Sequence, residues 1–151
     1  MLNLKTNFMQ NIGVYYEMFE NVIRSFGVDP VSCRGEQEGQ WNLQKGSAPV
    51  WVDIYAVEDG TYGYIQVMSP IYELPEGAKE DVFIEALEVN HKLFGCGITK
   101  FNNWLYIKGI RELEDLSEKE ITAMVNRVGN YADQYDDHFK NKFSLQGGKR
   151  M

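Results

Sequence analysis

Residues 50–69, VWVDIYAVEDGTYGYIQVMS, predict a β-hairpin and decide the class of the fold. Two runs rich in β-branched and aromatic residues flank Asp59–Gly60, a pair that favours the type I′ turn of a two-residue hairpin loop. Such a loop fixes the register, so that Val52 faces Val67. On this register one face of the hairpin is aliphatic. The other face is aromatic with polar tips and carries Trp51, Tyr55, Tyr62, Tyr64 and Met68.

A second hairpin with the same two-faced character is predicted for residues 96–109, CGITKFNNWLYIKG. It turns at Asn102–Asn103, because Asn tolerates the positive φ that a tight turn needs. Ile98 then faces Ile107 on the aliphatic side. The aromatic side carries Thr99, Phe101, Trp104 and Tyr106.

Three helices are expected around the hairpins. The first covers about residues 4–26, where apolar residues recur every three or four positions, and Gly27 ends it. The second covers about residues 79–94, and its apolar residues spread over roughly 220° at ~100° per residue. The third begins with a capping box at Ser117–Glu120 and carries one apolar stripe as far as Phe143.

The remaining segments complete one small domain. Residues 40–44 read as a short strand, and Pro70 and Pro75 bracket a loop. The order helix, three strands, helix, two strands, helix predicts an α+β fold on one antiparallel sheet. We expect a single domain over residues 1–143 and a flexible tail over residues 144–151.

Composition narrows the classes of partner. The 151 residues include 15 Lys and Arg against 22 Asp and Glu, a formal net charge of −7. This balance argues against binding to nucleic acid or to an anionic membrane. The two cysteines suggest no disulfide framework, and no signal peptide or membrane span is evident. We therefore expect a cytoplasmic protein.

Catalytic and metal-binding signals are sparse. Asp136, Asp137 and His138 are adjacent helix positions that point apart, so we expect them on a solvated helix face rather than around a metal. His91 is likewise expected at the surface. The sequence predicts no enzyme, no cofactor and no metal. The alternative is a small-ligand-binding protein or an enzyme with a pocket over the sheet, which a deep polar cavity with a perturbed acid would favour.

Two surfaces are candidates for protein contacts. The wide apolar arc of residues 79–94 is either buried within the fold or part of a subunit interface. Asn90 lies inside this arc and must find a hydrogen bond, by capping a strand or by pairing across the interface. The dimer-interface candidates are Val82, Ala86, Val89, Asn90 and Leu93.

The aromatic face is the second candidate surface. It is either core beneath a helix or a site for apolar anchors from an extended partner segment, with strand addition at a free sheet edge. We expect the first and last helices to cover the aliphatic face and to leave the aromatic face at least partly open. The partner-binding candidates are Trp51, Tyr55, Tyr64, Trp104 and Tyr106.

The stretch FIEALEVNHKLFGCGITKFNNWLYIKGIRELEDLSEKEITAMVNRVGNYADQY, residues 83–135, resembles the type III secretion chaperone-like fold family and, more closely, the YbjN-like proteins that share this fold. The motifs are Leu87-Glu88-Val89-Asn90 at the end of a helix, Leu105-Tyr106-Ile107 in a strand, and Leu116-Ser117 at the start of the last helix. The similarity spans about residues 15–135.

The resemblance implies a homodimer built around the second helix, no catalytic residues, and binding to another protein. Secretion chaperones of this fold wrap a non-globular segment of a partner around the dimer, and YbjN-like proteins are described as regulators. The sequence therefore predicts a bacterial, non-enzymatic, dimeric protein-binding domain, chaperone-like or regulatory, that binds an extended segment of a partner protein.

Overall fold

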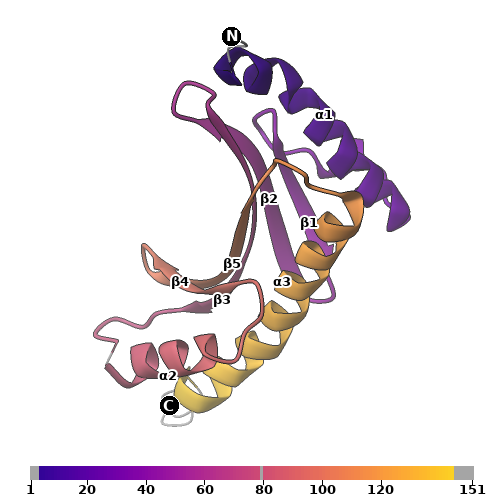
Figure 1. Cartoon of the computed structure of the whole chain (residues 1–151). Helices are drawn as coiled ribbons and strands as arrows, with labels where there is room; N and C mark the ends of the chain where they lie inside the picture. The colour runs from indigo at the N-terminus through magenta and orange to yellow at the C-terminus, as the bar shows by residue number, and fades with distance from the viewer. Residues whose placement is uncertain (1–3, 79, 145–151) are drawn as a thin grey trace.

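The computed structural model describes residues 4–78 and 80–144, and for residues 4–10 it describes the backbone alone. Within these residues the chain is an α+β domain whose helices and strands follow one another in the expected order (Figure 1). The elements are α1 (Leu4–Ser25), the 3₁₀ turn η1 (Pro30–Cys33), β1 (Gln40–Lys45), β2 (Ala48–Val57), β3 (Tyr62–Glu73), α2 (Glu80–Asn90), β4 (Gly97–Phe101), β5 (Trp104–Glu112), α3 (Glu118–Phe139) and the π-helical turn η2 (Lys140–Ser144).

The five strands form one antiparallel sheet in the order β1-β2-β3-β5-β4, so β1 and β4 are its edges. The predicted registers of both hairpins are confirmed: Val52 pairs with Val67, and Ile98 pairs with Ile107. In the first hairpin, Asp59 and Gly60 have φ of 55° and 84°, as the two central residues of a type I′ turn require. In the second, Asn102 has φ of 51°.

Two predicted boundaries were wrong. The expected loop at Pro70 is instead a continuation of β3 to Glu73. Proline has no N–H for the ladder, and the register with β5 shifts between Pro70 and Tyr72, so an irregularity in the strand accommodates it. Helix α2 ends at Asn90 rather than near Phe94, because the Asn90 side chain bonds the main chain of β4 and the backbone then turns away.

The core lies between the aliphatic sheet face and the two long helices, which run along the same side of the sheet (Figure 1). Both helices therefore cover the face that the hairpin registers indicated. The side chains of residues 4–10 and all of residues 145–151, part of the expected tail, lie outside the described residues. The buried core includes Val50, Val52, Ile65, Val67 and Ile107 of the sheet, Phe19, Val22 and Ile23 of α1, and Ile121, Val125 and Val128 of α3.

The predicted capping box at the start of α3 is present in part. Ser117 is the N-cap, and its Oγ accepts a hydrogen bond from the Glu120 N–H at 3.1 Å. The Glu120 carboxylate bonds the Ser117 hydroxyl at 3.1 Å and pairs with Arg111 at 2.8 Å. Among the described helices, none combines the length and the apolar character that crossing a membrane demands.

Candidate functional site

The sheet face opposite α1 and α3, here called the aromatic face, is not covered by any described helix (Figure 1). The structure brings its predicted residues together in two pairs. The rings of Trp51 and Tyr106 have centroids 6.1 Å apart, and so do the rings of Tyr55 and Tyr64. Trp104 lies further along β5 on the same face. All five side chains are half-buried, so each keeps some surface for a partner.

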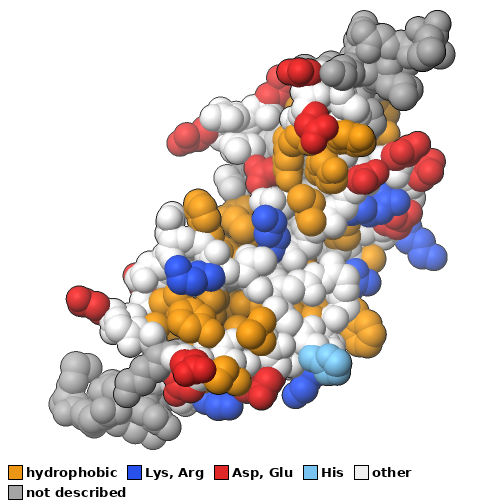
Figure 2. Space-filling model, turned by 60° about the vertical axis from the view of Figure 1, so that its left-hand side comes forward, with side chains coloured by type: hydrophobic (Ala, Val, Ile, Leu, Met, Phe, Trp, Pro, Cys, Tyr) orange, Lys and Arg blue, Asp and Glu red, His pale blue; other side chains and the backbone are white. Residues whose placement is uncertain are grey.

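The strand registers extend the aromatic face across the sheet. Met68 lies between Trp51 on β2 and Lys108 on β5, and Ile110 on β5 is 51% exposed. Figure 2 brings the side at the left of Figure 1 forward, and hydrophobic side chains gather there in patches with Lys or Arg beside them. An exposed apolar surface of this kind typically marks an interaction site.

The edge strand β1 offers free main-chain groups. The N–H of Ile54 donates to the Gly39 oxygen at 2.8 Å, so odd-numbered residues of β1 face β2 and even-numbered ones face outward. Gly35 occupies the beginning of this edge by donating to the Gln40 oxygen at 2.7 Å. An isolated antiparallel bridge also joins Arg34 to Trp41, so the part of the edge that a strand could pair with lies beyond Trp41, at the outward groups of Asn42 and Gln44.

A hollow of about 480 Å³ lies beside this edge on the helix side of the sheet. Its walls come from α1, residues 26–33, β1 and α3, and most of them are apolar. An added strand would place every second side chain over this hollow. The apolar lining residues are Ile23, Phe26, Val28, Cys33, Leu43 and Val125.

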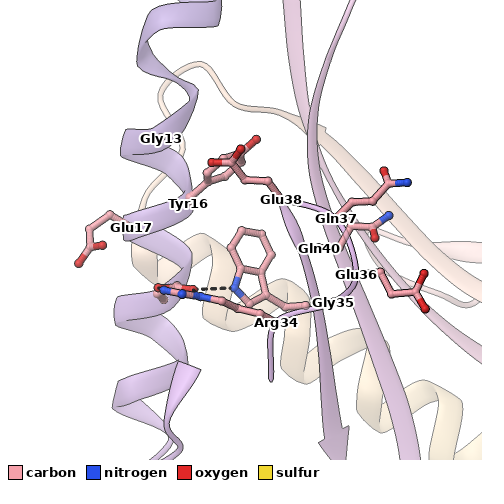
Figure 3. A pocket seen from close by; sticks show the side chains of 12 residues that line it. Gly13, Tyr16, Glu17, Arg34, Gly35, Glu36, Gln37, Glu38 and Gln40 are labelled. Atoms are coloured by element: carbon pink, nitrogen blue, oxygen red, sulfur yellow. Dashed lines mark hydrogen bonds and ion pairs between the residues drawn. The ribbon is translucent and has the colours of Figure 1, made fainter. Parts of the chain in front are cut away.

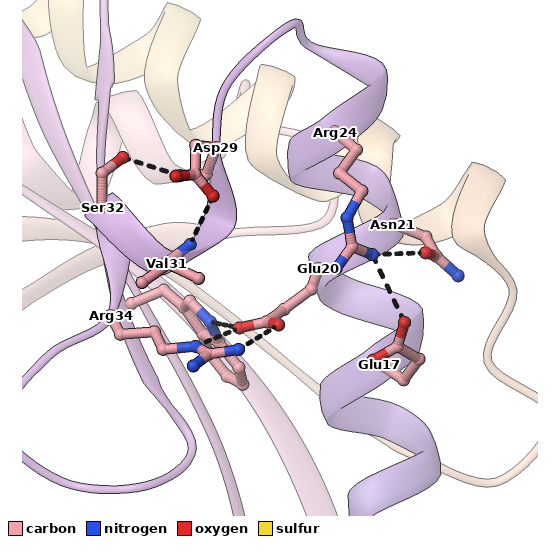
Figure 4. A network of polar contacts seen from close by, with 9 residues as sticks. Glu17, Glu20, Asn21, Arg24, Asp29, Val31, Ser32 and Arg34 are labelled. Carbon is pink, nitrogen blue, oxygen red and sulfur yellow. Dashed lines mark hydrogen bonds and ion pairs between the residues drawn. The ribbon is translucent and has the colours of Figure 1, made fainter.

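A buried carboxylate ties α1 to the segment that leads into β1 (Figure 4). Glu20 is 5% exposed and accepts hydrogen bonds from Nε and Nη2 of Arg34, both at 2.8 Å, and from the Trp41 indole at 2.9 Å. The Arg34 hydrogen bonds hold the pKa of Glu20 at about 2. A carboxylate that is ionised and fully paired is a structural tie rather than a general acid.

This cluster forms the floor of a hollow of about 390 Å³ between α1 and the segment 34–41 (Figure 3). Tyr16 and Glu38 lie at one end and Arg34 at the other. The sequence alone did not predict this cluster. The signal was Trp41, whose indole N–H needs an acceptor when buried, but nothing in the sequence identified Glu20 as that acceptor.

Helix α2 buries the residues that the sequence assigned to a dimer interface. Val82, Ala86 and Val89 are 4%, 7% and 4% exposed, because they pack into the core of their own chain. Leu93 is half-buried against the same core. The apolar residues that this segment leaves exposed are Ile84 at 46%, Leu87 at 70% and Phe94 at 74%.

Asn90 takes the first of its two expected roles and caps a strand in its own chain. Its Nδ2 donates to the Ile98 oxygen at 3.2 Å, and its Oδ1 accepts from the Ile98 N–H. Because β4 pairs only with β5, these bonds satisfy main-chain groups at the outer edge of β4. Strand addition is therefore blocked at this point, which leaves β1 as the more accessible edge.

The side chain of His138 is 40% exposed, as expected for a solvated helix face, but it also has a partner on another helix. Its Nε2 is 2.9 Å from Oε2 of Glu85 on α2, and Lys142 Nζ lies 3.0 Å from both oxygens of the same carboxylate. These hydrogen bonds lower the pKa of Glu85. Within residues 4–78 and 80–144, no group of three or more His, Cys, Asp or Glu residues could hold a metal ion.

One small hollow bears on the alternative prediction of a ligand pocket over the sheet, because an acid with a shifted pKa lies beside it. It has a volume of about 280 Å³ and lies beside Asp53 and Tyr55. Burial raises the pKa of the Asp53 carboxyl, which is hydrogen-bonded by Gln40. The volume falls below the roughly 300–1,000 Å³ usual for ligand pockets. A perturbed acid is thus present, but the hollow beside it is small.

The fold matches single chains of two solved protein complexes. One chain of the HopA1–SchA chaperone–effector complex matches with a TM-score of 0.62 and 15% identity, covering 85% of this chain and 97% of its own length. One chain of the ExoU–SpcU heterodimer, from the type III secretion system of Pseudomonas aeruginosa, matches with a TM-score of 0.57 and 11% identity, covering 80% and 96%. No protein-family model and no curated protein matches the sequence. The expected type III secretion chaperone-like fold is confirmed.

Proposed function

We propose that this chain is a non-enzymatic, chaperone-like protein that binds an extended segment of another protein across the aromatic face. The observation that carries the proposal is a sheet face with five half-buried Trp and Tyr side chains and no described helix over it. Tyr and Trp are the residues that most often anchor protein interfaces. One matching structure is a chaperone–effector complex and another is a heterodimer from a type III secretion system, which supports the same proposal.

The geometry suggests how such a segment would run. It would pair with the outward groups of Asn42 and Gln44 on β1 and continue over the aromatic face toward Tyr106 and Trp104. Four strand spacings of about 4.8 Å need about six extended residues, and pairing with β1 needs about four. A segment of roughly ten residues therefore fits this path.

A homodimer is the second part of the proposal. Ile84, Leu87 and Phe94 form an exposed apolar patch around α2, here called the α2 patch. A second copy that covers this patch would bury surface that one chain leaves in water. A bacterial cytoplasmic regulator of the YbjN-like kind would use the same two surfaces, and the identity of the bound partner distinguishes it from a secretion chaperone.

The test is co-purification of candidate partners, the proteins encoded beside its gene, with the wild type and single variants. Tyr106→Ala should weaken binding by roughly thirtyfold, about 2 kcal/mol, while the melting temperature changes little. Val14→Ala is the matched control, because Val14 is an apolar side chain on α1 that is 60% exposed and lies on the helix side of the sheet. It should leave binding within twofold.

Two outcomes would contradict the aromatic face as the site. If Tyr106→Ala unfolds the domain, the face is core rather than a binding surface. If Phe26→Ala, which truncates a lining residue of the hollow beside β1, abolishes binding and Tyr106→Ala does not, the partner uses that hollow alone.

A further inference from the structure

Lys108 is a cationic side chain in the middle of the aromatic face. On β5 it lies between Tyr106 and Ile110, and across the sheet it pairs in register with Met68. It is half-buried. Among the residues that the structure describes, none forms an ion pair or a hydrogen bond with its ammonium group.

The other charged groups of the face do not neutralise Lys108. Asp53 lies on β2, two strands away, and Gln40 already hydrogen-bonds its carboxyl. Glu112 lies four residues further along β5 and is exposed. The ammonium therefore depends on water for its solvation as long as the face is open.

A bound segment that covers the aromatic face would change the solvation of the Lys108 ammonium group. A purely apolar segment would remove water from the ammonium and leave a buried charge without a partner, which is unfavourable. A carboxylate at the same place would replace that water with a charge-assisted hydrogen bond. The aliphatic and aromatic neighbours of Lys108 would at the same time contact apolar residues on either side of the carboxylate.

We propose that the segment bound by the aromatic face carries an Asp or Glu with apolar residues on both sides, and that its carboxylate pairs with Nζ of Lys108. The inference rests on the proposed function and specifies the chemistry of the partner. It makes Lys108 the residue that selects among segments of equal hydrophobicity.

The experiment selects peptides from a random 12-residue display library on the purified wild-type protein. Enriched peptides are synthesised together with versions in which each Asp or Glu is replaced by Asn or Gln. Dissociation constants are measured for the wild type, Lys108→Met, Tyr106→Ala and Lys119→Met. Lys119 is the matched control because it is an exposed lysine at the start of α3, on the helix side of the sheet.

The expected result is enrichment of acidic residues flanked by apolar ones. Lys108→Met should bind the acidic peptides about tenfold more weakly than the wild type, equal to about 1.4 kcal/mol, and should bind the amide versions at least as well as the wild type does. Tyr106→Ala should bind both versions of each peptide more weakly, and Lys119→Met should bind both as the wild type does.

Different results would overturn the inference about Lys108 and the proposed function of the aromatic face. If peptides lose affinity for Tyr106→Ala but bind Lys108→Met as they bind the wild type, Lys108 stays in water at the rim and the inference is overturned, while the binding face stands. If no peptide is enriched, or none responds to Tyr106→Ala, both the inference and the proposed function on this face are overturned.

Discussion

Glu20 is a buried carboxylate whose hydrogen-bond partners strongly lower its pKa. Its pKa of about 2 in the folded chain, against an ordinary value of 4.5, corresponds to about 3 kcal/mol, which screening at the exposed Arg34 reduces to about 2 kcal/mol. Because this pKa is depressed, the stabilisation is fully present above about pH 4.5 and is lost as the pH falls toward about 2.

Glu20→Gln should therefore lower the free energy of unfolding by about 2 kcal/mol at pH 7 and flatten its pH dependence between pH 4.5 and 2. Urea denaturation at pH 7 and at pH 3 measures both effects. Glu17→Gln is the control, because Glu17 also pairs with an arginine on α1 but is 65% exposed. It should cost less than about 0.5 kcal/mol. Equal effects of the two substitutions would contradict the role of burial.

Ser69 carries a buried hydroxyl in the aliphatic core. It is 0% exposed, and its Oγ has no hydrogen-bond partner among the described residues. Ser69→Ala should raise the free energy of unfolding by about 1 kcal/mol, because it removes the desolvation cost of the hydroxyl. A thermal melt should show a midpoint about 2–4 °C higher. Ser47→Ala, which removes an exposed hydroxyl bonded to Asp133, should show no such rise. A lower midpoint for Ser69→Ala would show that the hydroxyl is satisfied.

At the scale of elements, the sequence predicted the features that depend on local residues better than the features that depend on long-range contacts. Asp59–Gly60 determines the turn of the first hairpin, so the register of this hairpin could be predicted from the sequence alone. The end of α2 could not be predicted, because it depends on a hydrogen bond from Asn90 to a strand residue eight positions away. The extension of β3 past Pro70 likewise depends on pairing with β5, which no local signal records. The aromatic face was predictable as a face, whereas the burial of Val89 in the core of its own chain required the packing of α2.

The attachment of α2 to the end of α3 yields a prediction at this scale. Glu85 holds His138 and Lys142, and the hydrogen bond from His138 contributes most to its lowered pKa. Glu85→Gln should loosen α2 and speed amide hydrogen exchange over residues 80–90 about fivefold at pH 7, without changing exchange in β2 and β3. Glu88→Gln is the control on the same helix, because Glu88 is exposed. Uniform acceleration in both variants would show that helix propensity rather than this contact holds α2 in place.

The pH dependence of this attachment has a definite sign. Because the pKa of Glu85 is lowered in the folded chain, the contact stabilises α2 above the ordinary glutamate pKa and weakens as the pH falls through the folded value. In Glu85→Gln this acid-dependent loosening of α2 should be absent.

For the whole molecule, the decisive quantity is the mass in solution. The α2 patch exposes Leu87 at 70% and Phe94 at 74%, and a symmetric copy that covered this patch would remove this apolar surface from water. Light scattering at micromolar concentration should give about twice the 17.4 kDa mass of one chain. Leu87→Glu should give the mass of one chain and should still unfold in one cooperative transition, because Leu87 contributes little to the core of its own chain. Val89→Glu, by contrast, should unfold the domain, because Val89 is 4% exposed within that core.

The matched control is Val31→Glu, a 60% exposed position on η1, which should remain dimeric. A wild type with the mass of one chain, or a Leu87→Glu variant that stays dimeric, would mean that the α2 patch contacts something other than a second copy.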